Sequence, residues 1–251
     1  MLRLRTFGGL WMESSKEVAD ARPRPRRLAL LAILAAAGNK GMSRERLLGI
    51  LWPDSEPDRA RHALSQTLYS LRRDVGADIV VATAQDLRLD PTQISSDLAD
   101  CRAAIRAEDW NRAAELYRGP FLDGFYLADA EEFERWVDEE RLSISKEAAK
   151  AIEAAARSAT EQKEFERAAG LWRTLTAVDP LSSRFAAAYM QALMATGESG
   201  GALAHAKAHA DAVRRELNAE PDAAVTRLAD QLRETSDPPQ VERRRAVSPG
   251  L

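Results

Sequence analysis

The stretch from Arg59 to Arg73 carries side chains that could bind a polyanion. When it is set out at 100° per residue, it forms a helix with two distinct faces. The apolar face consists of Ala60, Leu64, Thr67, Leu68, Leu71 and Val75. The opposite, polar face consists of Arg59, His62, Gln66, Tyr69 and Arg73, flanked by Ser65 and Arg72.

The side-chain types on this polar face match the chemistry of a DNA duplex. Arginine contacts phosphates or guanine, glutamine can pair with adenine, and serine and tyrosine hold phosphates. No acid lies between Arg59 and Arg73, where a carboxylate would repel the phosphate backbone. The face therefore predicts a contact with DNA. An ordinary amphipathic helix with a solvated polar face would show the same pattern. The surrounding sequence is needed to distinguish the two interpretations.

The charge around this helix differs from that of the whole chain. The 251 residues carry a net charge of −3. Residues 22–73 nevertheless contain eleven basic and four acidic residues, a net charge of +7. A basic segment of this kind is the usual electrostatic footprint of a polyanion partner. Local arginine enrichment on a solvated surface is the alternative explanation.

Turn and cap signals place the polar helix third in a series of three. The helices are expected over residues 26–37, 44–52 and 55–75. Ser43 and Ser55 are good N-caps, and Gly38 and Gly76 are stop signals. Two short apolar runs follow, Ile79–Ala82 and Leu87–Leu89, with the spacing of a β-hairpin. Three helices followed by a hairpin is the element order of a winged helix.

Residues outside this series have simpler patterns. Leu2–Phe7 is a strand candidate, and residues 13–25 read as a loop. From Asp97 onward the sequence is helical, and the motif AAxxY at 113–117 returns as AAxxW at 168–172. Ala202 follows Ala168 by 34 residues. Small residues at such a period are typical of tetratricopeptide-like helical hairpins.

These patterns together predict a mainly α protein. An N-terminal winged helix, with three helices, a β-hairpin and a short N-terminal sheet, precedes an all-α tetratricopeptide-like repeat domain. The Ser95-Ser96 pair caps the first helix of the second domain. The expected domains are therefore residues 1–96 and 97–235, with a disordered tail over 236–251.

Residues 26–76 resemble the OmpR-type DNA-binding winged helix of SARP-like bacterial regulators. The resemblance rests on the motifs LWP at 51–53, RAxxAL at 59–64 and LRRxxG at 71–76. It implies that the third helix enters the major groove and that the loop from Thr83 to Arg88 belongs to the wing. The candidate DNA-binding residues are Arg59, His62, Ser65, Gln66, Tyr69, Arg72, Arg73 and Arg88. The wing departs from the usual pattern, because it reads TAQDLRLD without a glycine or a tyrosine.

Residues 113–141, 179–206 and 214–232 resemble the bacterial transcriptional activator domain, the helical partner that follows the winged helix in such regulators. The resemblance implies a transcriptional regulator, expected to be an activator. Its implied partners are promoter DNA, bound as a homodimer, and RNA polymerase or a signalling protein. The alternative is a tetratricopeptide-like scaffold whose winged helix makes protein contacts. An enzyme is a more distant interpretation, since no catalytic cluster is recognisable.

Other potentially reactive residues favour structural explanations. His205 and His209 have a spacing that can bind a metal, but no further ligand lies nearby in the sequence, so a surface or groove pair is expected. No metal or cofactor is predicted. Acidic residues around Phe133 and Trp136 read as the solvated face of a helix. Cys101 cannot form an internal disulfide. Without a signal peptide or a run of about 20 apolar residues, the chain is expected in the cytoplasm with no membrane contact.

Overall fold

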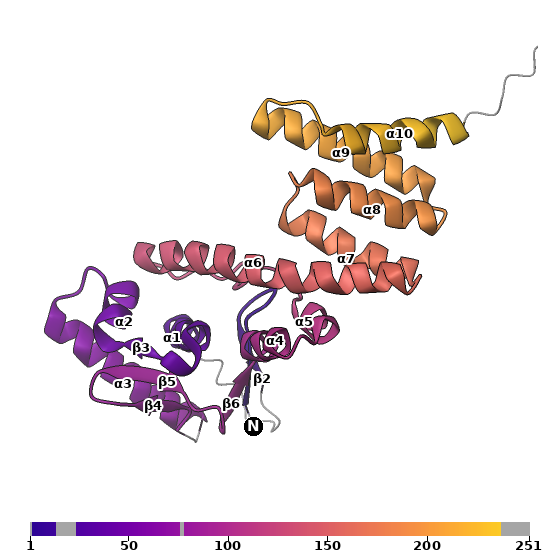
Figure 1. Cartoon of the computed structure of the whole chain (residues 1–251). Coiled ribbons are helices and arrows are strands. Elements are labelled where there is room, and N and C mark those ends of the chain that lie inside the picture. The colour runs from indigo at the N-terminus through magenta and orange to yellow at the C-terminus, as the bar shows by residue number, and fades with distance from the viewer. Residues whose placement is uncertain (1, 14–23, 76–77, 237–251) are drawn as a thin grey trace, which may run out of the picture. The chain divides into compact units, whose positions relative to one another are not determined.

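The computed structural model describes residues 2–13, 24–75 and 78–236 (Figure 1). The chain divides into two compact units, Met1–Ala155 and Ala156–Leu251. The division expected after residue 96 falls inside the first unit, where a strand passes directly into a helix. Of the tail expected over 236–251, only Ser236 lies within the described residues, and it ends a helix. The stop signal at Gly76 also lies outside them.

The mainly helical fold predicted from the sequence is confirmed. The helices of the first unit are α1 (Pro25–Ala37), α2 (Arg44–Leu51), α3 (Pro57–Val75), α4 (Asp97–Arg106) and α5 (Trp110–Leu116). Helix α6 (Glu131–Glu161) begins in the first unit and ends in the second. The second unit continues with α7 (Phe165–Val178), α8 (Ser183–Ala195), α9 (Ser199–Leu217) and α10 (Ala223–Ser236).

Helices α1, α2 and α3 are followed by a hairpin, in the order that the sequence predicts. The hairpin strands are β4 (Val80–Ala82) and β5 (Asp86–Leu89), paired antiparallel with Val81 opposite Arg88. A third strand, β3 (Met42–Ser43), pairs with β5 and gives the sheet order β3-β5-β4. With two residues, β3 is too short for any alternation of apolar and polar residues to reveal it.

Gly41 allows β3 to approach β5. Its φ of +69° lies in a region that L side chains rarely adopt. A Cβ at this position would lie 2.6 Å from the carbonyl oxygen of Leu87. Only glycine therefore fits here without moving the backbone.

The N-terminal sheet is small and mixed. Its order is β2-β1-β6, where β1 is Leu2–Arg5, β2 is Trp11–Glu13 and β6 is Ile94–Ser96. The Asp97 carboxylate, which is buried, accepts hydrogen bonds from the Thr6 backbone N–H at 2.9 Å and the Thr6 hydroxyl at 2.6 Å. It also accepts one from the Phe7 N–H. This carboxylate fastens the end of β1 to the start of α4, a long-range contact that the sequence pattern does not reveal.

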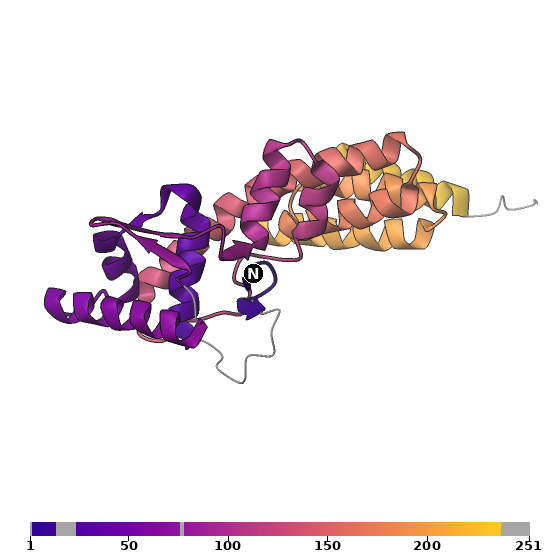
Figure 2. The ribbon, with the colours of Figure 1, turned by 90° about the horizontal axis from the view of Figure 1, so that it is seen from below.

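Helix α1 forms the centre of the first unit. All eight residues from Ala29 to Ala36 are buried, so the helix is covered on every side. It lies beside α2, α3, the hairpin sheet and α4, as Figure 2 shows from a second direction. The Arg102 guanidinium on α4 donates to the carbonyl of Ala36 at 2.7 Å and to the Glu147 carboxylate on α6 at 2.9 Å. Helix α4, which begins directly after residue 96, thus packs against α1.

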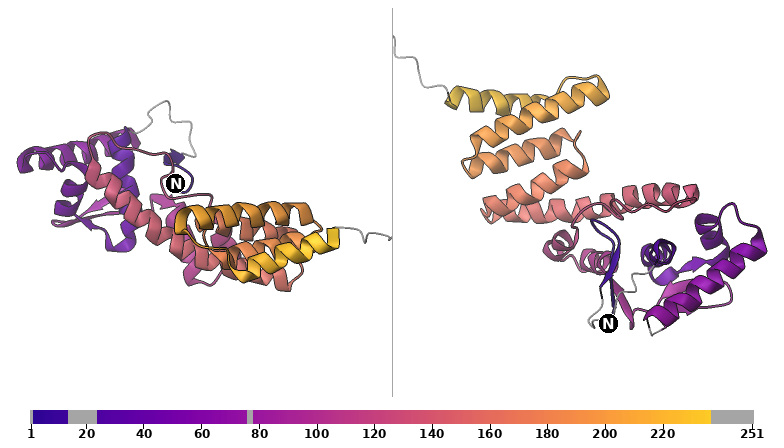
Figure 3. Two further views of the ribbon diagram at one scale, coloured as in Figure 1. Left: turned by 90° about the horizontal axis from the view of Figure 1, so that it is seen from above. Right: turned by 180° about the vertical axis from the view of Figure 1, so that it is seen from behind.

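The second unit is a series of helical hairpins (Figure 3). Helix α8 packs against α7, α9 and α10. The repeated small residues Ala168 and Ala202 are fully buried, and Trp172 is 6% exposed. Small side chains at these positions let neighbouring helices approach closely, as the repeat predicts.

Candidate nucleic-acid interface

Helix α3 has a sharply divided surface. On its inner face Ala60, Leu64 and Leu71 are buried. Thr67, which is half-buried, directs its hydroxyl to the carbonyl of Ala63 at 2.8 Å, so its polar group is satisfied within the helix. The apolar stripe predicted from the sequence is therefore the face that packs on the core. The rest of the helix lies along one edge of the first unit (Figure 2).

All eight predicted DNA-binding residues are exposed. They are Arg59, His62, Ser65, Gln66, Tyr69, Arg72, Arg73 and Arg88. Seven of them share the outer face of α3, and Arg88 lies on β5. Tyr69 stands out because 64% of this large aromatic residue is exposed. A solvated aromatic ring beside arginines offers a surface that bases or sugars can contact.

The arginines of α3 differ in their pairing. Arg72 lies 2.9 Å from the Asp78 carboxylate, and Arg73 lies 3.3 Å from Asp74. Within the described part of the chain, Arg59 has no ion-pair or hydrogen-bond partner. Exposed pairs such as that of Arg72 are worth little in water, so a phosphate could replace the carboxylate at small cost.

Arg61 is a further candidate that the sequence pattern did not single out. It is exposed on the same helix and pairs with Asp58 at 2.6 Å within the first turns. Its carbonyl accepts the Ser65 hydroxyl at 3.0 Å, which places Ser65 one turn further along the same side. At 100° per residue, Arg61 lies about 20° from Arg72, at the border of the polar face. The helical projection of the sequence could therefore have identified Arg61.

The inner helices hold α3 in place. Arg27 on α1 forms an ion pair with Asp74 on α3, and both side chains are largely buried, with 15% and 16% exposed. The Arg26 guanidinium lies over the Trp52 ring, 5.8 Å from its centroid. Ser43 caps α2 by accepting the Arg46 backbone N–H, as predicted. The Arg27–Asp74 pair thus braces α3 from its inner side, while the other two contacts hold α2 in place.

The turn between β4 and β5 closes without a glycine. The Thr83 hydroxyl accepts the Asp86 backbone N–H at 2.9 Å, and the Thr83 N–H donates to the Asp86 carbonyl at 2.9 Å. Arg44, at the start of α2, donates to the Thr83 carbonyl at 3.3 Å. A threonine-based turn thus takes the place of the glycine-rich one. It leaves Arg88 exposed but also exposes Asp86.

The histidine pair is part of the second unit's packing. His209 is 3% exposed, so the expectation of a surface or groove position is wrong for this residue. Its ring lies 3.1 Å from the Ser183 hydroxyl and 3.0 Å from the Pro180 carbonyl. His205 packs edge-on against Tyr189, and burial lowers its pKa, with a smaller contribution from His209. Both side chains therefore join α9 to α8 and the loop before it.

Cys101 is buried, and burial raises the pKa of its thiol to about 11. A thiol with such a pKa is a poor nucleophile. Among the described residues, no cluster of three or more histidine, cysteine or acidic side chains could hold a metal. No helix in the described ranges has the length and apolarity to cross a bilayer.

Residues 88–233 match the family described as the bacterial transcriptional activator domain. This match covers more than half of the 251 residues. The chain belongs to this family. The bacterial transcriptional activator domain thus extends from β5 through α10, across both compact units.

A solved structure supports the same architecture. EmbR from Mycobacterium tuberculosis, in complex with a low-affinity phosphopeptide, is similar with a TM-score of 0.64 and 18% sequence identity. The similarity covers 93% of this chain and 65% of the EmbR chain, so this chain spans about two thirds of that protein. At 18% identity, the similarity to EmbR shows the fold of this chain alone. A comparison with curated protein sequences gives no match.

Proposed function

We propose that the protein is a sequence-specific DNA-binding transcriptional activator. In this proposal residues 1–96 form the DNA-binding domain, with an OmpR-type winged helix built from α1, α2, α3 and the β4–β5 hairpin. Residues 97–235 form the domain that contacts other proteins. The family membership supports the role in transcription, and the resemblance of residues 26–76 supports the winged helix.

The outer face of α3 is the observation that carries the proposal. It combines four exposed arginines, Arg59, Arg61, Arg72 and Arg73, with Gln66 and Tyr69. The arginines bind phosphates and guanine, and Gln66 reads an adenine edge. The residues of α3 that pack on the core are apolar. The whole outer face is therefore available to bind a partner.

The neighbouring elements extend the proposed contact. Arg88 and the Thr83 turn form a wing beside α3, which contacts the minor groove or the adjoining backbone. Asp86 makes close approach to phosphate less favourable there. The wing therefore contributes less than α3 to affinity.

The helical domain supplies the proposed protein contacts. Two copies of the chain bind neighbouring DNA half-sites as a homodimer, and the helical repeats contact RNA polymerase or a signalling protein. Helical repeats present extended surfaces that suit such contacts. A second candidate function, a scaffold in which the winged helix binds protein, is favoured by the carboxylate partners of Arg72 and Arg73, since paired arginines are also common on protein-docking surfaces.

The two functions are distinguished by DNA selection with the full chain. Protein is mixed with fragmented genomic DNA, and the retained fragments are sequenced. The proposal predicts enrichment of a shared sequence that the double variant Arg59→Ala/Gln66→Ala does not enrich. The matched control, Arg227→Ala/Gln191→Ala, alters exposed residues of the second unit and should select the same DNA. Retention of no fragment by the wild-type protein at low salt would contradict DNA binding and favour the scaffold.

A further inference from the structure

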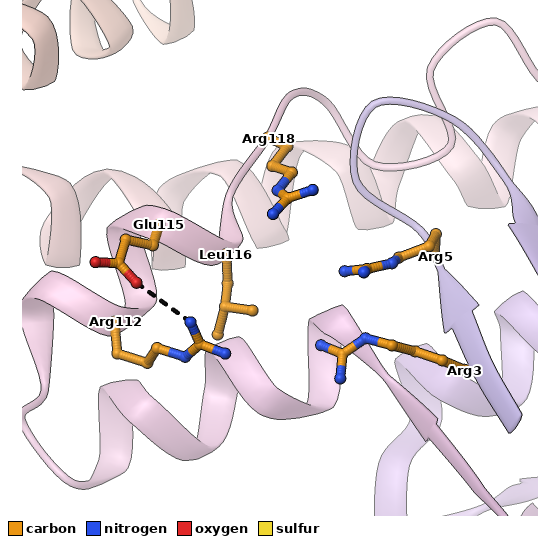
Figure 4. Close-up of a pocket in the computed structure, with 6 residues that line it drawn as sticks. All are labelled: Arg3, Arg5, Arg112, Glu115, Leu116 and Arg118. Carbon is orange, nitrogen blue, oxygen red and sulfur yellow. Dashed lines mark hydrogen bonds and ion pairs between the residues drawn. The ribbon is translucent and has the colours of Figure 1, made fainter. Parts of the chain in front are cut away.

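Four arginines line one cavity in the first unit, away from α3. The cavity has a volume of about 510 Å³. Its lining residues are Arg3, Arg5, Arg112, Glu115, Leu116 and Arg118. Figure 4 shows Arg3 and Arg5 reaching from β1 toward α5, Arg112 reaching back from α5, and Arg118 extending from the loop that follows. The guanidinium groups therefore approach a common space from different elements.

The protein itself leaves many donors of these arginines unused. Arg3 donates to the Asp100 carboxylate at 2.8 Å through Nη2, while its buried Nε has no acceptor within the described residues. The Nε of Arg5 lies 3.0 Å from Glu13. A guanidinium carries five N–H donors, so one carboxylate contact leaves most of them available.

Arg112 and Arg118 complete the set from the opposite side. Arg112 pairs with Glu115 at 3.2 Å, and more than half of both side chains is exposed. Arg118 is exposed and has no ion-pair or hydrogen-bond partner in the described parts of the chain. The loop that carries it is fixed, because the Gly8 N–H donates to the Pro120 carbonyl at 3.0 Å. The cation is thus held near β1 by the backbone.

The charges at the cavity favour an anionic ligand. Four arginines and Glu115 line it, and the outer partners Glu13 and Asp100 carry two further negative charges, so the net charge of these groups is +1. The interaction with the Glu13 carboxylate raises the pKa of Arg5. A dianion would add strong charge-assisted hydrogen bonds to the unused N–H groups.

We propose that this cavity, which we call the arginine cavity, binds a small phosphorylated molecule. A phosphate group presents acceptor oxygens in several directions, which suits arginines that approach from β1, α5 and the following loop, whereas a carboxylate is planar. The volume is typical of a small-molecule site and is larger than one phosphate group needs. Leu116 supplies an apolar surface for the organic part of the ligand.

A purely structural role for these arginines makes different predictions. Arg3 and Arg5 also join β1 to α4 and β2 through their ion pairs, and that role needs no ligand. This structural role gives Arg118 no function. Substitution of Arg118 therefore separates the two roles, because among the described residues its side chain takes part in no ion pair or hydrogen bond.

The test is titration calorimetry of the full chain with pyrophosphate at constant ionic strength. Inorganic phosphate, sulfate and citrate serve as comparison ligands. Pyrophosphate should bind the wild-type protein, and Arg118→Ala and Arg112→Ala should each weaken binding about ten-fold, as removal of a charge-assisted hydrogen bond implies. Glu115→Gln should strengthen binding a few-fold because it removes the carboxylate that lines the cavity. Arg227→Ala, an exposed arginine on α10, is the matched control and should bind as the wild type does.

The basic face of α3 could also attract pyrophosphate, so the double variant Arg72→Ala/Arg73→Ala belongs in the same series. The proposal predicts that it retains pyrophosphate binding, whether or not α3 binds DNA. Three results would overturn it. These are equal binding by wild type and Arg118→Ala, abolished binding only in the α3 variant, and citrate binding as tightly as pyrophosphate at the arginine cavity.

Discussion

Helices α1 and α3 pack against each other but differ in how much of their surface is buried. In α1, eight consecutive residues are buried, and the helix packs against α2, α3, α4 and the hairpin sheet. In α3, which is longer, only Ala60, Leu64 and Leu71 are buried. Substitutions in α1 should therefore act on stability, and substitutions on the outer face of α3 should act on binding.

The largest effect is expected from removing a core side chain of α1. Leu34 is completely buried, so Leu34→Ala should lower the free energy of unfolding by about 2–5 kcal/mol. Tyr69→Ala removes more atoms, but from an exposed position on α3, and should change it by less than about 0.5 kcal/mol. Urea denaturation of both variants measures the difference. Equal destabilisation by the two substitutions would contradict the contrast.

A smaller effect is expected at Asp74, which pairs with Arg27 of α1 and with Arg73 of α3. Arg27→Ala leaves a largely buried carboxylate without its inner partner and should cost about 3 kcal/mol of unfolding free energy. Arg73, whose side chain is 64% exposed, should cost less than about 1 kcal/mol when replaced by alanine. Thermal unfolding at matched pH compares the two. If Arg73→Ala proved the more destabilising, α3 would depend on its outer face for stability.

The smallest change concerns the selectivity of DNA binding. Gln66→Ala should leave the unfolding free energy unchanged and lower the preference for the selected DNA over a scrambled duplex by about 1–3 kcal/mol. Competition fluorescence anisotropy with the two duplexes measures this preference. Gln191→Ala, at an exposed position on α8, is the control and should keep it. An unchanged preference in Gln66→Ala would remove this residue from base reading.

Local signals predicted much of the fold. The Ser43 and Ser96 caps both accept backbone N–H groups at helix starts, and α3 has its first-turn proline at Pro57. Strands β3 and β6 could not be predicted in this way. Each has only two or three residues, and each exists because a partner distant in the sequence pairs with it. Asp97, buried at the junction of β1 and α4, depends on the same long-range pairing.

The two candidate sites also differ in whether their residues are neighbours in the sequence. The α3 face could be found because its residues are neighbours on one helix, where a fixed angle per residue brings them together. The arginine cavity could not, because Arg3 and Arg118 lie over a hundred residues apart and are brought together by long-range backbone contacts such as that of Gly8 with Pro120. The burial of His209 escaped prediction for a similar reason, since its partners Ser183 and Pro180 lie on other elements.

The salt dependence of DNA binding shows whether the arginines of α3 hold DNA phosphates. Binding of the full chain to the selected duplex is measured by anisotropy across a salt series, for the wild type and for Arg72→Ala/Arg73→Ala. Arg227→Ala/Arg233→Ala on α10 is the control. If α3 holds DNA phosphates, the α3 variant should bind more weakly, and its log–log slope should flatten by about 1 for each phosphate that it no longer binds. An α3 variant with the affinity and slope of the wild type would show that α3 does not bind the DNA backbone.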